Sequence, residues 1–189
     1  MSREIIRCKW CLSDEKYIDY HDNEWGKPIY EDSKLFEYLL LETFQAGLSW
    51  IIILKKRKAF KKLFNNFNYK IIANYSNEKI DYLCTKPEII RNRLKIEATR
   101  TNAAAFIKIQ QEFKSFSKYI WGFVNNKPIK NSFQKTKNIP KNTLLSKKIS
   151  KDLKDRGFKF VGSTIMYAYM QAIGMVNDHT TDCFKYNQV

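Results

Sequence analysis

A single acidic residue interrupts a long apolar segment of the chain. The segment LLLETFQAGLSWIIIL, residues 39–54, carries one formal charge, at Glu42. Burying a lone carboxylate costs several kcal/mol unless it is paired or gives up its charge. Glu42 is therefore expected to have a partner or to give up its charge, and a buried salt bridge is the ordinary explanation.

The two histidines and two of the four cysteines form a second candidate group. His179 and Cys183 are four residues apart, so within one helical turn their side chains share a face. Cys8 and His21 lie near the other end of the chain. Two cysteines and two histidines complete a tetrahedral zinc site with no position left for water, which indicates a structural Zn²⁺ that joins both ends of the chain.

Two other interpretations of these residues stay open. Cys8 and Cys11 form a CxxC pair, which by spacing alone is the stronger zinc signal. The other possibility is plain buried thiols and a surface histidine. A disulfide framework is not expected, because the N-terminus lacks the apolar core of a secretory signal.

A helix–turn–helix pattern over about residues 146–174 could hold an anion. Its turn, RGFKFVG, has glycines at positions 157 and 162, and Gly162 leads directly into a helix N-terminus. Free backbone N–H groups and the helix dipole favour an anion there. Arg156, Gly157, Lys159 and Gly162 are therefore expected to contact a DNA backbone, as in a helix–hairpin–helix, although an ordinary helical hairpin has the same pattern.

Three motifs together carry a family resemblance: YHDNEWG at residues 20–26, QAGLSW at 45–50, and RGFKFVG at 156–162 with NDH at 177–179. They resemble 3-methyladenine DNA glycosylase I, the constitutive alkylation-repair family of bacteria. The resemblance extends from Cys8 to Cys183, and the pairing of the first two motifs is highly specific.

The resemblance implies a fold, an activity and a metal. The fold is the all-α helix–hairpin–helix glycosylase fold. The activity is hydrolysis of the N-glycosidic bond of 3-methyladenine in double-stranded alkylated DNA, which releases the free base, leaves an abasic site and includes no lyase step. The family's structural zinc ligands match Cys8, His21, His179 and Cys183, which favours this set over the CxxC pair.

The resemblance also implies how the base is bound. Glu42 matches the family's base-contacting glutamate, and N3-methylation makes adenine a cation that such a carboxylate would prefer. Tyr20 and Trp50 match its aromatic walls. The full set expected to bind the base is Glu42, Tyr20, Trp50, Trp10, Trp25 and Tyr17. Without the motifs, ordinary core packing of the aromatic residues and a buried salt bridge at Glu42 would be the preferred interpretations.

Three further residues bear on the same site. Gly47 and Leu48, at a break between two helices, are candidates for an apolar plug that fills the gap left by a flipped base. The family usually carries a glutamine where this chain has Phe44, so one polar contact near the lesion is in doubt. Asp178 is expected to be structural.

The elements that must position these residues are all helical, in one domain spanning residues 1–189 or in two helical lobes of it. The predicted helices cover about 34–46, 50–64, 69–75, 78–84, 88–113, 116–124, 146–155 and 163–173. The predicted N-caps are Asp32 or Ser33 for the first helix and Ser146 and Ser163 for the last two, with Gly174 as a stop. Residues 125–145 have no periodicity and are expected to form an irregular connection.

The charge balance points to a polyanionic partner. Lysine and arginine number 34 against 19 acidic residues, a formal charge of +15, which favours nucleic acid over a membrane surface or compositional drift. No apolar run reaches the roughly 20 residues that a bilayer requires. A cytoplasmic protein is expected, and a monomer, since one flipped base needs no dimer. A non-catalytic lesion sensor and a zinc-stabilised nucleic-acid-binding module are the two rival functions.

Overall fold

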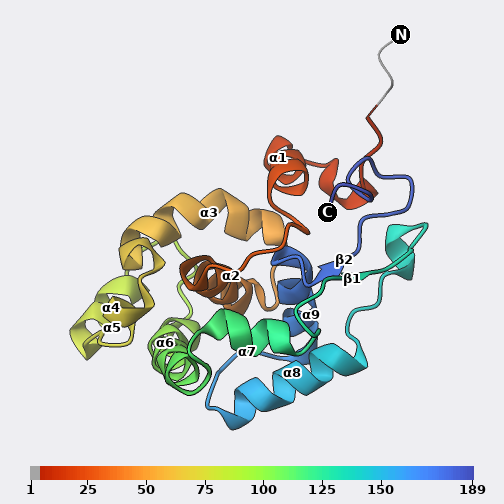
Figure 1. Cartoon of the computed structure of the whole chain (residues 1–189). Coiled ribbons are helices and arrows are strands. Elements are labelled where there is room, and N and C mark those ends of the chain that lie inside the picture. Colours follow the sequence, from red (N-terminus) through yellow and green to blue (C-terminus); the bar gives the residue numbers. More distant parts are fainter. Residues whose placement is uncertain (1–4) are drawn as a thin grey trace.

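The computed structural model describes residues 5–189, and this part of the chain is mostly helical (Figure 1). Within it lie nine α-helices: α1 (Glu15–Asn23), α2 (Asp32–Gln45), α3 (Trp50–Leu63), α4 (Tyr69–Ile72), α5 (Asn77–Cys84), α6 (Arg93–Phe113), α7 (Phe116–Gly122), α8 (Leu144–Asp155) and α9 (Ser163–Ala172). Short 3-10 turns cover Lys9–Cys11, Asn65–Phe67 and Thr136–Asn138. The helical class is confirmed, with one small exception: β1 (Ile129–Lys130) pairs in parallel with β2 (Val176–Asn177).

Helix α2 is the centre of the fold. Every residue from Leu35 to Phe44 is buried, and a helix that is buried all round is a core helix rather than a surface one. Helices α3, α6, α7 and α9 contact it, as Figure 1 shows. This position brings Glu42 into the interior, although nothing in the apolar packing itself requires a carboxylate.

Two of the predicted helix caps are wrong. Helix α8 is capped by Thr143, whose hydroxyl accepts a hydrogen bond from Ser146 N at 3.1 Å. The Ser146 hydroxyl closes a capping box by accepting from Thr143 N at 2.9 Å, so Ser146 lies inside the helix. Helix α9 is capped by Gly162 rather than by Ser163, and no side chain bonds to its first N–H groups.

The start of two other helices also differs from the prediction. Helix α2 has Glu31 at its N-cap position without a side-chain bond, and Ser33 lies inside the helix. The Asp32 carboxylate instead accepts from Phe116 N at 2.9 Å and Ser117 N at 2.8 Å, in the first turn of α7. Helix α6 begins at Arg93 rather than near residue 88, because Asn92 caps it. Helix α1 was not among the predicted helices.

The two ends of the described chain lie side by side (Figure 1). Phe184 N donates to the Ile6 carbonyl at 3.0 Å. Gly174, which follows α9, has a φ of +73°, and a Cβ on it would lie 2.4 Å from the backbone of Lys27. Only glycine fits there, so this turn brings the C-terminal segment against the segment that follows α1. No helix in residues 5–189 combines the length and apolarity needed to cross a membrane.

Candidate functional site

A pocket of about 340 Å³ opens between α1, α2, the start of α3, α9 and the connection around residues 136–141. The volume suits a small organic ligand. The six residues that the sequence singled out for base binding all line it: Trp10, Tyr17, Tyr20, Trp25, Glu42 and Trp50. The other lining residues are Gln45, Thr136, Ile139, Pro140, Lys141, Thr164, Tyr167, Ala168 and Gln171.

Glu42 is the buried acid of this pocket. Its residue surface is 3% exposed, and burial raises the pKa of the carboxyl group to about 8. No charged or hydrogen-bonding neighbour among residues 5–189 contributes to that shift. A carboxyl group held dry without a partner is costly, which is typical of a group that meets its partner in a ligand.

The pocket collects polar atoms that lack hydrogen-bond partners. Five buried side-chain nitrogen or oxygen atoms in residues 5–189 have no partner. Four of them belong to residues that line this pocket: Glu42 Oε2, Gln45 Oε1, Trp50 Nε1 and Thr136 Oγ1. Because buried polar groups are nearly always satisfied in folded proteins, this concentration indicates a site shaped for a polar ligand.

The aromatic residues form a continuous wall rather than two facing plates. The ring centroids of Tyr20 and Trp50 are 5.6 Å apart, with their planes at 51°. Trp10 packs edge-on against Tyr17 at 5.5 Å and against Trp25 at 5.0 Å. The Tyr17 hydroxyl accepts a hydrogen bond from Ile51 N at 2.9 Å, which joins α1 to the start of α3.

The opposite side of the pocket was missed in the sequence. Four lining residues, Thr164, Tyr167, Ala168 and Gln171, follow the i, i+3, i+4, i+7 spacing of one face of α9. Polar side chains at this helical spacing could have indicated from the sequence that this face of α9 lines a pocket. Asp178 is 1% exposed and accepts from the Tyr167 hydroxyl and from Gln171 Nε2, both at 2.7 Å. It holds two pocket residues in place, which agrees with a structural role.

An ion-pair network joins the three segments that carry Tyr20, Glu42 and Trp50. Arg57 of α3 contacts Glu24, which follows α1, at 2.6 Å and Glu37 of α2 at 2.7 Å. The Tyr38 hydroxyl donates to the same Glu24 carboxylate at 2.5 Å. Each of these residues lies one or two helical turns from Tyr20, Glu42 or Trp50, so the network fixes the relative positions of α1, α2 and α3.

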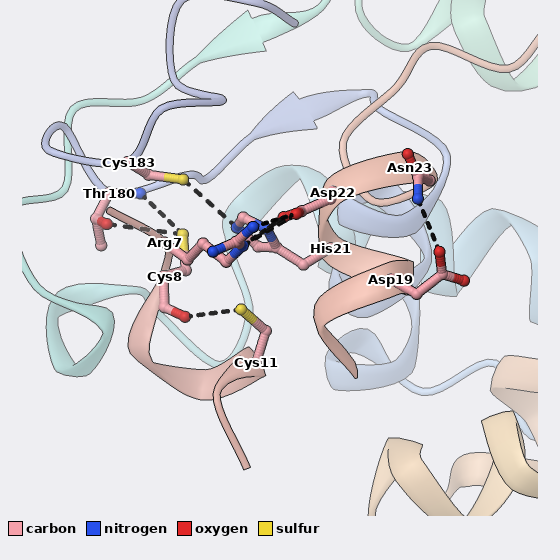
Figure 2. Close-up of polar contacts among 9 residues, drawn as sticks. All are labelled: Arg7, Cys8, Cys11, Asp19, His21, Asp22, Asn23, Thr180 and Cys183. Atoms are coloured by element: carbon pink, nitrogen blue, oxygen red, sulfur yellow. Dashed lines mark hydrogen bonds and ion pairs between the residues drawn. The ribbon is translucent and has the colours of Figure 1, made fainter. Parts of the chain in front are cut away.

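A cluster of metal-ligating side chains lies where the two ends meet (Figure 2). The ligand atoms of Cys8, His21 and Cys183 lie within 4.8 Å of one another, and all three residues are buried. Cys183 Sγ is 3.4 Å from His21 Nε2. A hydrogen bond from Cys8 lowers the pKa of the Cys183 thiol, and His21 lowers it further. The contact therefore favours a thiolate at Cys183, the form that binds metals, and it raises the pKa of the Cys8 thiol.

His179 lies beside this cluster with one free nitrogen. Its ring centroid is 5.0 Å from that of His21. Nδ1 is 3.1 Å from Asn177 Oδ1, whereas the buried Nε2 has no partner. Burial lowers the pKa of His179 to about 3, which keeps the imidazole neutral. His21 is oriented in the same way by Asp22, 2.7 Å from its Nδ1. Such outer partners are usual for histidine ligands.

Cys11 does not point into the cluster. Its thiol donates to the Cys8 carbonyl at 3.1 Å, as Figure 2 shows. Burial raises the pKa of Cys11 to about 11, so this thiol stays protonated. The geometry therefore groups Cys8 with the C-terminal residues rather than with Cys11.

In the turn between α8 and α9, Lys159 is available to contact DNA, whereas Arg156 is paired within the protein. Lys159 is exposed, and Gly157 has a φ of +92°, which favours glycine. Arg156 is instead engaged, since it bonds to Glu112 at 2.6 Å and to Asp152 at 2.7 Å. Its charge is thus largely neutralised within the protein. Gly162 caps α9 and leaves the first N–H groups of that helix without a side-chain partner.

The residues at the end of α2 and in the turn after it differ in exposure. Leu48 is 37% exposed, and Gly47 has a φ of +82° with open space around it. Phe44, by contrast, is fully buried and packs its ring against Phe60 and Phe64 at 4.7 and 5.7 Å. It belongs to the core and does not line the pocket, where Gln45 presents an amide instead.

Comparison with known proteins identifies the family of this chain. Residues 10–186 match the methyladenine glycosylase family. DNA-3-methyladenine glycosylase of Haemophilus influenzae is 46% identical over 177 residues, covering 94% of this chain and 96% of the relative. DNA-3-methyladenine glycosylase 1 of Escherichia coli is 45% identical over 180 residues, covering 95% and 96%.

Solved structures give the same result. A crystal structure of 3-methyladenine DNA glycosylase I superposes with a TM-score of 0.92 at 46% identity, covering 95% of this chain and 98% of that one. The Staphylococcus aureus enzyme, solved to explain 3-methyladenine recognition, gives a TM-score of 0.92 at 37% identity, covering 95% and 96%. The chain belongs to the methyladenine glycosylase family, whose members are hydrolases acting on N-glycosyl bonds. Within that class its resemblance is to 3-methyladenine DNA glycosylase I, and the family expected from the motifs is confirmed.

Proposed function

We propose that this protein, acting as a monomer with one glycosylase domain, excises 3-methyladenine from alkylated double-stranded DNA and leaves an abasic site. The observation that carries the proposal is Glu42, a buried carboxyl group without a counter-ion in a pocket walled by aromatic rings. A 3-methylated adenine in DNA is positively charged and flat, so it satisfies both features. Unmodified adenine lacks the charge.

Selection of the base combines charge, stacking and hydrogen bonds. The ionised Glu42 carboxylate stabilises the cationic ring. The faces of Tyr20 and Trp50 attract it by stacking and cation–π contact. Glu42 and Gln45 Oε1 accept hydrogen bonds, whereas Trp50 Nε1 donates one, and adenine offers both an amino donor and ring-nitrogen acceptors. Trp10, Tyr17 and Trp25 support the wall.

The chemical step needs little acid catalysis. A positively charged purine is already a good leaving group, so holding it out of the duplex allows its bond to the sugar to break and water to capture the sugar cation. Lys141, at the edge of the pocket, is exposed to solvent, whereas an amine nucleophile is normally desolvated. The reaction is therefore monofunctional, and borohydride should trap no covalent DNA complex.

Two turns are proposed to bind the duplex. Leu48 fills the space left by the flipped base, and Gly47 allows the backbone to approach. The turn between α8 and α9 acts as a helix–hairpin–helix in which Lys159, Gly157 and the free N–H groups after Gly162 contact phosphates. Arg156 is proposed to hold this turn in place through its ion pairs with Glu112 and Asp152 and not to contact phosphate.

Zn²⁺ is proposed as the structural metal of the Cys8, His21, His179 and Cys183 cluster. Cys8, His21 and Cys183 bring three donor atoms together, and the buried, partnerless Nε2 of His179 beside them would supply the fourth ligand. The metal would join the two ends of the chain and so stabilise the fold. Metal analysis of single alanine variants tests this: each of the four should lose bound zinc, whereas Cys11→Ser should keep it. Retention in His179→Ala or loss in Cys11→Ser would contradict the assignment.

The experiment that tests the function is incubation with methylated duplex DNA followed by chromatography of the released bases. We expect free 3-methyladenine in the supernatant and an alkali-labile abasic site in the DNA. A lesion sensor would bind the same DNA and release nothing. A nucleic-acid-binding module would also fail to change Trp fluorescence when free 3-methyladenine is added.

A further inference from the structure

Two buried polar residues of α6 have no place in the pocket or in the metal cluster. Lys95 is 6% exposed and Asn102 is 3% exposed. They are seven residues apart, so they share one face of the helix. Both side chains reach out of α6 to the backbone of other segments. Those segments are the two turns proposed to contact DNA.

The Lys95 ammonium group contacts both turns. It donates to the Phe44 carbonyl at 2.8 Å and to the Ala46 carbonyl at 2.5 Å, at the end of α2. A cation there satisfies carbonyls that the helix leaves free and complements its dipole. The same nitrogen lies 5.9 Å from the centroid of the Phe160 ring, in the turn between α8 and α9.

Asn102 binds the second turn through both the backbone N–H and the backbone carbonyl of one residue, Lys159. Its Oδ1 accepts from Lys159 N at 2.8 Å, and its Nδ2 donates to the Lys159 carbonyl at 3.1 Å. This pair of bonds fixes the backbone of Lys159 while its side chain stays exposed. The Lys159 side chain is thereby free to contact solvent or a phosphate.

Plain packing does not explain these residues. Burial alone lowers the pKa of Lys95, and no acid in residues 5–189 contributes to offset it. An apolar residue would fill the same space without the cost of a desolvated cation. What the polar groups add is direction, because they hold specific backbone atoms at fixed positions. The held atoms are the carbonyls of Phe44 and Ala46, which precede Leu48, and the backbone N–H and carbonyl of Lys159.

We propose that Lys95 and Asn102 are positioning residues for DNA binding, which set the separation of the 46–48 turn and the 156–162 turn so that both engage one duplex. The inference rests on the proposed function. It assigns α6 a part in the reaction although neither residue touches the base. Loss of either contact should therefore weaken duplex binding and leave the base pocket intact.

The test compares Asn102→Leu with Gln110→Leu. Gln110 is a matched control, since it is an amide on the same helix that donates to Asp32 and Tyr69, away from both turns. Affinity is measured for a duplex with a stable abasic-site analogue and, separately, for free 3-methyladenine. We expect Asn102→Leu to lose on the order of tenfold in duplex affinity, with free-base affinity unchanged. Gln110→Leu should change neither.

A second pair of variants covers the case in which Asn102→Leu does not fold. Lys95→Met should weaken duplex binding, and Lys95→Arg, which keeps the cation and its donors, should restore part of it. Equal losses in Asn102→Leu and Gln110→Leu, or a parallel loss of free-base affinity, would overturn the inference. So would equal duplex affinity in Lys95→Met and the wild type.

Leu48→Ala and Lys159→Ala separate this inference from the function beneath it. If both variants weaken duplex binding while Asn102→Leu and Lys95→Met do not, only the positioning role is refuted. If the wild-type protein does not bind duplex DNA, the proposed function itself fails.

Discussion

The rings of Tyr20 and Trp50 pack against each other, with centroids 5.6 Å apart, so in the proposed function a base would stack against this pair and not between its members. The side of the pocket that carries no tryptophan is the face of α9 with Tyr167 and Ala168. The pocket is thus built from helices at opposite ends of the chain. The ion pairs of Arg57 with Glu24 and Glu37 hold the helices on its aromatic side in place.

Removing the Trp50 ring should weaken base binding. Stacking on an aromatic side chain contributes ~1–3 kcal/mol per base, so Trp50→Ala should lose about 10- to 100-fold in affinity for free 3-methyladenine. Calorimetric titration of each variant with free 3-methyladenine measures this affinity. Tyr82→Ala is the control, because that ring lies on α5, is 47% exposed and does not line the pocket. Equal affinities for Trp50→Ala and the control would refute the stacking role.

The protonation state of Glu42 gives the reaction a pH dependence. Burial raises its pKa to about 8, so near neutral pH most of the free enzyme holds the uncharged acid. A cationic base binds the ionised form, and kcat/KM should therefore rise with pH and level off above about pH 8. In Glu42→Gln that rising limb should be absent. A wild-type profile that is flat across this range would be inconsistent with a titrating Glu42.

The same pKa has the opposite consequence for folding. An acid whose pKa is raised from 4.5 to about 8 binds its proton more tightly in the native state than in the unfolded chain. The free energy of unfolding should thus fall as pH rises through this window. Each unit of difference corresponds to ~1.4 kcal/mol, so the loss is a few kcal/mol.

Urea unfolding of Glu42→Gln checks this sign. The variant should be more stable than the wild type above about pH 8, and the difference should shrink toward the ordinary pKa of a glutamate. Glu37→Gln is the contrasting variant, because that acid on the same helix is paired with Arg57 at 2.7 Å. It should destabilise the protein, and equal stabilities for Glu42→Gln and the wild type at high pH would contradict the account.

Exposed Lys159 should contribute a single phosphate contact. Lys159→Ala should weaken binding to any duplex sequence and reduce the slope of log K against log salt by about 1. Lys70→Ala, an exposed lysine on α4, should leave the slope unchanged. An unchanged slope for Lys159→Ala would remove this residue from the interface.

Local patterns predicted the helices other than α1 and the candidate acid, and distant contacts determined the rest. Glu42 was singled out because it is the one charge in an apolar segment, and Tyr20, Trp25 and Trp50 because they fall within contiguous motifs. Thr136 was not, since the connection that carries it has no periodicity and reaches the pocket only through tertiary packing. The caps at Ser146 and Ser163 failed because Thr143 and Gly162 compete for the same role one to three positions earlier. Arg156 looked free in the sequence, but its partner Glu112 lies on another helix.

We infer that the buried Glu42 carboxylate selects a base because damage has made that base positive. The most direct measurement is the rate of 3-methyladenine release from methylated duplex DNA by the wild type and by Glu42→Ala, with both proteins shown to be folded and to hold zinc. We expect release by Glu42→Ala to fall by about 100-fold or more. Release at the wild-type rate by folded Glu42→Ala would contradict it.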